Sequence, residues 1–266
     1  MNSLAFDPAG LTRNRNRVSS RQNGLVQEQR LRRRVRAFLV LLPLFAFPSR
    51  PHSTFAQAPA SQPAPDRGIF EILSAKNKVG TERFEIKTIE SGWEASGELQ
   101  LQGPGGAKVS ETSTLRLDAK LHPSRYERVQ KSPNSGKLSA QFGATETLLE
   151  MTDDDEPFQQ VFYLPPNDLV VLDTNFFHHF ALLLRLYDRA KGMAQAFNVF
   201  IPQEALPGTI NLLFVAKESI TVGQSARELD HFQAVTDELQ IEIWATPEGA
   251  IQRISIPQAD LEVVRQ

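Results

Sequence analysis

Two adjacent histidines in the segment "DTNFFHHFALLL", residues 173–184, are the side chains of this sequence best suited to chemistry. Imidazole nitrogens bind zinc and carry protons in acid–base catalysis, and Asp173 or His231 could complete such a site in space. A helical two-histidine site requires a spacing of four residues, which puts both rings on one face. His178 and His179 are adjacent and would point about 100° apart on a helix. We therefore expect capping or solvated histidines, and we predict no metal site and no cofactor.

Other residue types that could support catalysis lack the partners that catalysis requires. No serine lies in a Gly-x-Ser-x-Gly motif, and no glycine-rich phosphate loop leads from a strand into a helix. Glu71, Glu82 and Glu98 could pair across strands, as the two carboxylates of a glycosidase do, but exposed strand charges explain them more simply. The acidic run "TDDDEP" at 152–157 lacks the alternating ligands and the central glycine of an EF-hand. The sequence therefore predicts no catalytic residue and a protein that is not an enzyme.

Charge is distributed unevenly along the chain. Residues 1–56 contain ten of the 29 Lys and Arg residues but two of the 31 Asp and Glu residues. The remainder has 19 basic and 29 acidic side chains, which gives it a net charge of −10. Such an acidic domain has no basic surface for phosphates, so we exclude nucleic acid as a partner. The sequence also contains no cysteine, which excludes disulfides, thiol catalysis and lipid attachment through a lipobox cysteine.

The N-terminal region has the pattern of an export signal. Four arginines within residues 32–36 precede the apolar run 37–47, which is too short to span a hydrocarbon core about 30 Å thick but suits a signal peptide. We predict general secretion with cleavage near Ala56, which places the mature protein in the bacterial periplasm or outside the cell. An uncleaved anchor and twin-arginine export are the alternatives.

These features divide the chain into three parts. Residues 1–56 form an N-terminal extension and signal peptide, residues 57–67 form a Pro/Ala-rich linker, and residues 68–266 form a single β-rich domain. The polar stretch before the arginines is longer than a signal peptide needs, so we expect translation to begin near Val26. The mature protein would contain no transmembrane span.

Within residues 68–266 the apolar residues recur with a period of two. The segments "TERFEIKTI", "STLRLDAKL" and "LQIEIWA" each place apolar side chains on one face and polar side chains on the other. Turn sequences such as "AKNKVG", "SPNSG" and "TPEG" separate the strands. A sheet with one apolar face must close on itself or be covered. We therefore predict a mainly β domain, an antiparallel meander sheet curved into a half-barrel or open barrel.

One helix, over about residues 175–191, is predicted to cover the apolar face of this sheet. Residue 174 or 175 would cap its start, and Gly192 would cap its end. With about 3.6 residues per turn, one broad apolar face collects six side chains. These are Phe176, Phe177, Phe180, Leu183, Leu184 and Tyr187. Both histidines would lie on or beside the polar face.

The opening hairpin "GIFEILSAKNKVGTERFEI" and the closing "LQIEIWATPEGAIQRISIP" resemble a known group of proteins. They are similar to the uncharacterised secreted bacterial DUF3108-like family, which looks like the half-barrels of lipoprotein carriers of the LolA/LolB type. The similar features are Phe70, the Gly80-Thr81-Glu82 start of the second strand, and Trp244 with the Pro-Glu-Gly turn after it. The resemblance implies a curved sheet that shields an acyl chain beneath helices, and it implies no catalytic residues. Without a cysteine this chain departs from the lipid-anchored members.

Three functions are consistent with these patterns. The first is an exported non-enzymatic protein that binds or carries an apolar, lipid-like ligand in the cell envelope, with Phe177, Leu184 and Trp244 as ligand contacts. The second is a structural or envelope-assembly domain with a packed core and a protein partner. The third is an exported hydrolase without a recognisable motif. A cavity beneath the helix would favour the first, because a lipid-sized site needs about 300 Å³ or more, whereas a packed core leaves little void.

Overall fold

Alternating apolar and polar residues produce one large sheet in the computed structural model of the chain, which describes residues 64–266 except 104–105, 133–134, 154–155 and 223–224. In this part of the chain, fifteen strands pair in the order β8-β7-β6-β5-β4-β3-β2-β1-β15-β14-β13-β12-β11-β10-β9. Their bounds are β1 (Asp66–Ser74), β2 (Asn77–Ile89), β3 (Gly92–Gln102), β4 (Lys108–Leu117), β5 (Pro123–Ser132), β6 (Gly136–Phe142), β7 (Thr147–Asp153), β8 (Glu156–Phe162), β9 (Leu169–Val171), β10 (Ala194–Ile201), β11 (Leu206–Val222), β12 (Ser225–Val235), β13 (Gln240–Ala245), β14 (Ile251–Ile256) and β15 (Leu261–Arg265). Short 3₁₀ helices lie at η2 (Pro166–Asp168), η3 (Arg189–Lys191), η4 (Pro202–Glu204) and η5 (Pro257–Ala259).

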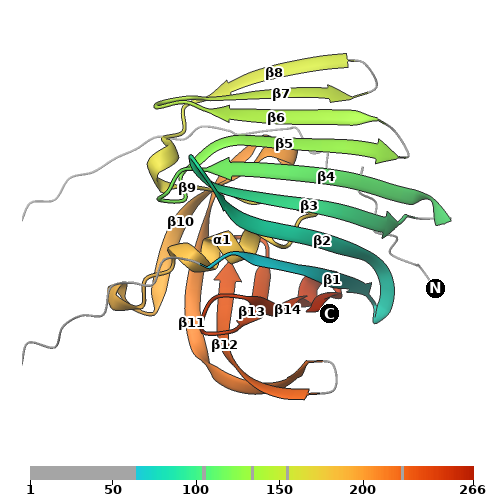
Figure 1. Cartoon of the computed structure of the whole chain (residues 1–266), viewed down its shortest axis with the longest axis vertical. Coiled ribbons are helices and arrows are strands. Elements are labelled where there is room, and N and C mark those ends of the chain that lie inside the picture. The colour runs from blue at the N-terminus through green and yellow to red at the C-terminus, as the bar shows by residue number, and fades with distance from the viewer. Residues whose placement is uncertain (1–63, 104–105, 133–134, 154–155, 223–224) are drawn as a thin grey trace, which may run out of the picture. The chain divides into compact units, whose positions relative to one another are not determined.

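The sheet is a meander whose first and last strands meet in its middle. Strands adjacent in sequence pair antiparallel, apart from β9, which pairs parallel with β10 and does not pair with β8. The first strand pairs antiparallel with the last, with Phe70 opposite Arg265. This pair joins the half made of β1–β8 to the half made of β9–β15, and β8 and β9 remain as the two edges (Figure 1). The predicted antiparallel meander, curved into an open barrel, is confirmed.

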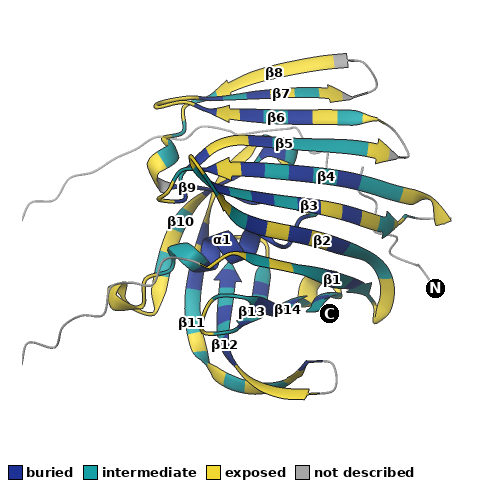
Figure 2. Ribbon diagram, in the orientation of Figure 1, coloured by how far each residue is buried: buried dark blue, intermediate teal, exposed yellow. Residues whose placement is uncertain are grey.

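One face of the strands lines the core, as the predicted period of two requires. On β3, Trp93, Ala95 and Leu99 are buried and alternate with more exposed residues (Figure 2). The two halves of the sheet also meet through aromatic side chains. The rings of Phe142 on β6 and Phe162, at the end of β8, have centroids 6.4 and 5.0 Å from that of Phe200 on β10. The apolar faces of both halves therefore share one core.

The helix α1 (His179–Leu186) lies inside the sheet, so the predicted helical cover is confirmed, but it is shorter than the predicted span 175–191. Tyr187 adopts an extended backbone, with φ −70° and ψ 124°, and this ends the helix. The 3₁₀ helix η3 follows, and Gly192, at φ 108°, caps η3 instead of α1. A local turn after Tyr187 thus replaces the predicted last turn.

The predicted exposure of three polar residues is wrong. His178, His179 and Glu82 are each fully buried. The sequence places the histidines on a polar helix face, but α1 has no solvent-exposed face at its start, because residues 179–184 are all buried. A helix that is enclosed on all sides is expected to be apolar all round, and "HFALLL" is apolar except for its first residue. The histidine rings therefore need partners inside the protein.

The start of the folded domain is close to the predicted one. Strand β1 begins at Asp66, two residues before Gly68, and Arg265 of the last strand binds Asp66 with an Nη2–Oδ1 distance of 2.6 Å. The predicted N-terminal extension and signal peptide lie outside the described residues, as do residues 57–63 of the predicted linker. Within the described ranges, no helix is long and apolar enough to cross a membrane.

Candidate functional site

The segment that precedes α1 is held by a carboxylate from a distant strand. The Glu82 side chain on β2 points into the core, where its Oε2 accepts a hydrogen bond from the Phe177 backbone N–H at 2.8 Å and its Oε1 accepts one from the His178 N–H at 3.3 Å. The first N–H groups of a helical segment have no partner within the helix. Glu82 therefore supplies acceptors for two N–H groups of the turn that leads into α1, which the local sequence does not supply.

The same carboxylate contacts the ring of His178, with 2.5 Å between Oε1 and Nδ1. Burial raises the pKa of Glu82 to about 8, although the two backbone N–H groups oppose this shift. Burial lowers the pKa of His178 to about 3. Both pKa shifts favour the neutral form of the side chain, as expected where no solvent reaches either group. The contact is therefore best described as a carboxylic acid hydrogen bonded to a neutral imidazole.

A second buried polar group holds the start of the same segment. The Tyr126 hydroxyl on β5 donates to Asp173, whose Oδ1 accepts the Asn175 N–H at 2.7 Å. Burial raises the pKa of Asp173 to about 6, although the charge of Arg128 opposes this shift. Arg128 in turn binds Glu111 on β4, with 2.7 Å between Nη2 and Oε1. The turn at residues 173–175 is thus fixed to strands β4 and β5.

Ring contacts join the two buried groups into one cluster. The His178 and His179 rings are perpendicular, with centroids 4.6 Å apart, and the His179 ring lies 5.8 Å from that of Tyr126, again edge to face. Close packing at this point requires a glycine. A Cβ added to Gly97 on β3 would lie 2.6 Å from Phe176 Cδ1 and 2.8 Å from His178 Cε1. The segment 173–179 therefore sits directly on the backbone of the sheet.

The chemistry available to this cluster is limited by its burial. Glu82, His178, His179 and Tyr126 are fully buried, and Asp173 is nearly so. Within the part of the chain that the structure describes, no group of three or more His, Asp or Glu side chains has a geometry that could hold a metal ion. A general acid or base must reach the proton that it transfers. The carboxyl groups of Asp173 and Glu82 accept hydrogen bonds from the backbone of residues 175, 177 and 178, so they anchor the segment that leads into the helix.

The three residues predicted to contact a ligand do not lie together. Phe177 and Leu184 are buried in the core, 6% and 7% exposed. Trp244 on β13 alternates with the buried Ile243 and Ala245, so its ring lies on the opposite face of the sheet. Phe177 and Leu184 therefore share the core on the inner side of the sheet, and Trp244 lies on the outer face.

Trp244 belongs to a polar cluster on the outer face of β11–β14. Its ring stacks on that of His231, with centroids 4.6 Å apart, and its indole N–H donates to Glu218 at 2.9 Å. His231 contacts two carboxylates, with Nδ1 at 3.0 Å from Glu218 and Nε2 at 2.7 Å from Glu242. Arg253 lies over the Trp244 ring at 5.1 Å. Neighbouring side chains thus contact the indole ring and its N–H.

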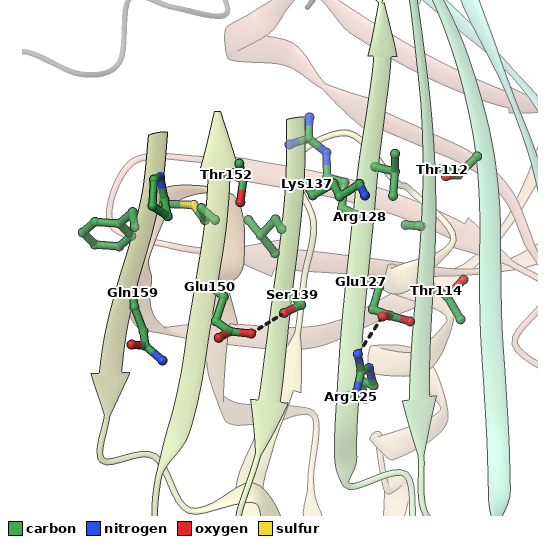
Figure 3. Close-up of a pocket in the computed structure, with 16 residues that line it drawn as sticks. Thr112, Thr114, Arg125, Glu127, Arg128, Lys137, Ser139, Glu150, Thr152 and Gln159 are labelled. Atoms are coloured by element: carbon green, nitrogen blue, oxygen red, sulfur yellow. Dashed lines mark hydrogen bonds and ion pairs between the residues drawn. The ribbon is translucent and has the colours of Figure 1, made fainter. Parts of the chain in front are cut away.

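A groove of about 830 Å³ lies on the outer face of β4–β8 (Figure 3). Its walls are mostly polar side chains that alternate with the core residues, among them Thr112, Thr114, Glu127, Lys137, Ser139 and Gln159. Charged groups of both signs are present and partly paired, since Arg125 Nη2 lies 2.9 Å from Glu127 Oε1 and Ser139 donates to Glu150 at 3.3 Å. The groove therefore has neither the apolar lining that a lipid needs nor an excess of one charge.

Sequence reasoning missed the buried carboxylates, and a signal for one of them was present. Glu82 shares its strand face with Phe84 and Ile86, so the period of two already places it on the buried side. A charged residue on an apolar face is rarely left without a partner. Its partners, the N–H groups of Phe177 and His178, are 95 and 96 residues away in sequence and could not be identified from spacing.

Comparisons with known proteins agree with the fold and add no function. No family model matches the sequence, and no curated protein matches it. Among solved structures, a β-barrel-like protein of the domain of unknown function DUF1849 from Brucella abortus has a TM-score of 0.52 at 10% identity, covering 77% of this chain and 96% of that chain. A DUF1089 family protein from Pseudomonas aeruginosa has a TM-score of 0.42 at 12% identity, covering 67% and 90%.

The DUF1849 likeness shows a β-barrel-like fold, which is the architecture expected from the sequence. It shows the fold alone, because one fold supports many functions and 10% identity carries no site residues across. The more specific resemblance to the DUF3108-like family and to lipoprotein carriers is not confirmed by these comparisons.

Proposed function

We propose that this chain is an exported, non-enzymatic domain of the bacterial cell envelope that acts through its outer surface, as a structural or assembly module with α1 as a permanent part of its core. The observation that carries this proposal is the packing of α1. All six residues from His179 to Leu184 are buried, and the core around them includes the aromatic side chains of both halves of the sheet. An apolar ligand beneath the helix would have to displace Phe177 and Leu184.

The buried polar cluster supports a fixed helix. An α1 that swings out to admit a ligand would break the two backbone hydrogen bonds to Glu82 and the Tyr126–Asp173 contact. It would also leave the Glu82 carboxyl without its His178 partner. Losing the partner of a buried polar group costs roughly 1–3 kcal/mol for each group, so opening would require several such costs together. These contacts favour the assembly module over the carrier.

Export and the lack of enzymatic activity are supported by sequence features. An arginine-rich stretch followed by a short apolar run and small residues is typical of a secretion signal. The acidic remainder without cysteine suits an envelope protein that is stabilised by its core. The buried carboxyl groups of Glu82 and Asp173, whose pKa values are raised, accept hydrogen bonds from the backbone of residues 175–178. This structural use of both groups supports a protein that is not an enzyme.

The test is native mass spectrometry of the processed protein purified from its own periplasm, followed by solvent extraction and lipid analysis. We expect the mass of the polypeptide without an adduct, and no displacement of a fluorescent fatty acid. A stoichiometric acyl-chain adduct would overturn the proposal in favour of a carrier. In that case Leu184→Ala should change the adduct, whereas Gln100→Ala on the exposed face of β3 should not. The N-terminal residue of the same sample tests export, because a mature chain that begins near Gln57 is expected.

A further inference from the structure

The two edges of the sheet differ sharply in their exposure. The edge strand β9 has three residues, all buried. The other edge strand, β8, has seven residues, and Phe158 to Val161 are all exposed (Figure 2). Three of the exposed large apolar side chains in the described residues lie in or next to this strand. They are Phe158, which is 45% exposed, Val161, which is 46% exposed, and Tyr163. A long edge with apolar side chains presents unpaired N–H and C=O groups that favour pairing with another strand.

Edge strands that remain unpaired are usually protected by charges, above all by lysine. The segment 157–166, "PFQQVFYLPP", contains no charged residue. Pro157, the second residue of the strand, lies opposite Thr152 and has no N–H group to offer. The centre of β8, at Gln159 and Gln160, has no such protection. From Phe158 to Phe162 the strand therefore lacks the charges and prolines that keep an edge free.

From this edge we infer that β8 pairs antiparallel with β8 of a second copy of the chain, about a two-fold axis at Gln160. In an antiparallel pair, residues opposite each other share a face of the sheet. A two-fold axis perpendicular to the sheet keeps the faces of both copies aligned, so it must pass through a residue position and not between two residues. The axis at Gln160 puts Phe158 opposite Phe162 of the second copy and Gln159 opposite Val161 of the second copy.

This arrangement extends the core of each copy. Phe158 lies opposite Met151 of β7, and Met151 and Phe162 both pack against the core cluster. The Phe158–Phe162 pairs would therefore continue the apolar row across the interface on the inner face. Aromatic pairs at opposite positions are among the cross-strand contacts that stabilise antiparallel sheets.

The distribution of charge favours a second copy of the chain as the partner that pairs with β8. A two-fold axis brings each residue close to its own equivalent, so every charge near the axis would face a like charge. The remainder of the chain after residue 56 has a net charge of −10, which makes most of its surface unfavourable for self-association. Strand β8 has a single charged residue, Glu156 at its start, and its uncharged remainder from Pro157 to Phe162 is an edge at which two such domains can meet without that cost. The inference goes beyond the proposed function, because a carrier or an enzyme with this edge would pair in the same way.

The first experiment is sedimentation equilibrium of the processed chain and of charge variants at the axis. We expect the wild type to have the mass of a dimer. Gln160→Lys and Gln160→Glu should each weaken dimerisation about tenfold or more, because like charges would face each other, and an equimolar mixture should restore it as a heterodimer. Gln100→Lys, at an exposed position of the interior strand β3, is the control and should remain dimeric. Monomeric wild type, or dimers that Gln160→Lys leaves intact, would overturn the inference.

A cross-linking experiment tests the register independently, and the cysteine-free sequence makes it simple. The axis at Gln160 places the two Cβ atoms of this position about 4.5–5.5 Å apart, near the range that a disulfide bridges. Mild oxidation of Gln160→Cys should give a covalent dimer in high yield, while Gln100→Cys should stay monomeric on a denaturing gel. Equal cross-linking of both variants would show random collision and refute the symmetric pair.

Discussion

The protein contains histidine–glutamate contacts in two opposite environments. In the core, His178 and Glu82 are fully buried and contact each other and the first turn before α1. On the outer face, His231 lies between Glu218 and Glu242, where water still reaches the carboxylates. Burial raises the pKa of Glu82, whereas the hydrogen bonds from Trp244 and His231 lower the pKa of Glu218.

The difference shows that the surroundings decide what the same two side chains do. The buried pair is neutral, and Glu82 stabilises the fold by accepting hydrogen bonds from the backbone N–H groups of Phe177 and His178. The surface cluster is partly exposed, so the energy of its contacts is reduced by solvent and by salt. The buried contact should therefore control stability and its dependence on pH, while the surface contact should contribute little. Four experiments test this contrast, from the largest expected effect to the smallest.

Replacing Glu82 by alanine should have the largest effect. It leaves the Phe177 and His178 N–H groups and the His178 ring without a partner in the core, so we expect a loss of roughly 3–5 kcal/mol in the free energy of unfolding. Urea denaturation followed by tryptophan fluorescence measures it. Glu82→Gln keeps an uncharged acceptor and should cost about a third of that. If Glu82→Gln is as damaging as Glu82→Ala, the buried pair is charged and the contrast fails.

Adding a methyl group beneath the buried pair should have the next largest effect. Gly97→Ala would push a Cβ within 3 Å of Phe176 and His178, and we expect a loss of about 1–3 kcal/mol from overpacking. Gly208→Ala on β11 is the matched control, because its nearest neighbour, Val199 Cγ2, lies at 3.7 Å. Thermal or urea unfolding of both variants decides the matter. Equal effects at the two positions would show that residues 176–178 can move away from the sheet.

The free energy of unfolding should depend on pH through the titration of Glu82. Because its folded-state pKa is raised from 4.5 to about 8, the folded protein keeps a proton that the unfolded chain releases. This contribution is complete below pH 4.5 and is lost as the pH rises towards 8. The lowered pKa values of His178 and His179 act mainly below pH 6.5 and oppose the fall weakly above it, and the raised pKa of Asp173 acts mainly below about 6. Between pH 6.5 and 8 we therefore expect the free energy of unfolding to fall by about 1–2 kcal/mol.

Denaturation curves at half-unit pH steps test this slope, and Glu82→Gln is the control. The variant has no proton to lose at position 82, so its stability should be flat over the same interval. A wild-type slope of the opposite sign, or one that persists in Glu82→Gln, would rule out a protonated Glu82 in the folded state.

Removal of the surface histidine should have the smallest effect. His231→Ala breaks two contacts to carboxylates and one ring stack, and we expect a loss of about 1 kcal/mol or less. The loss should shrink at high salt, because the contact is exposed to ions. Unfolding in low and high sodium chloride measures both. A loss above that of Gly97→Ala would show that the outer cluster is as important for stability as the core.

The sheet could be predicted from the sequence alone, because strand periodicity and turn residues are local. The alternation in "TERFEIKTI" and "STLRLDAKL" predicts which face of β2 and β4 is buried, and the structure agrees. The apolar composition of "FALLL" likewise predicts a helix in the core. These features depend on neighbours two to four residues away, which a single sequence displays.

The positions of the buried polar groups depend on contacts between distant parts of the chain and could not be predicted in this way. The sequence predicted wet histidines, a cap at 174 or 175 and a glutamate exposed on β2, and all three predictions are wrong for the same reason. Glu82 meets His178 across 96 residues, and a polar group is buried at lower cost when it has such a partner. No local pattern encodes a pairing of that length. Which edge of the sheet is left open was likewise decided by how the two halves fold together.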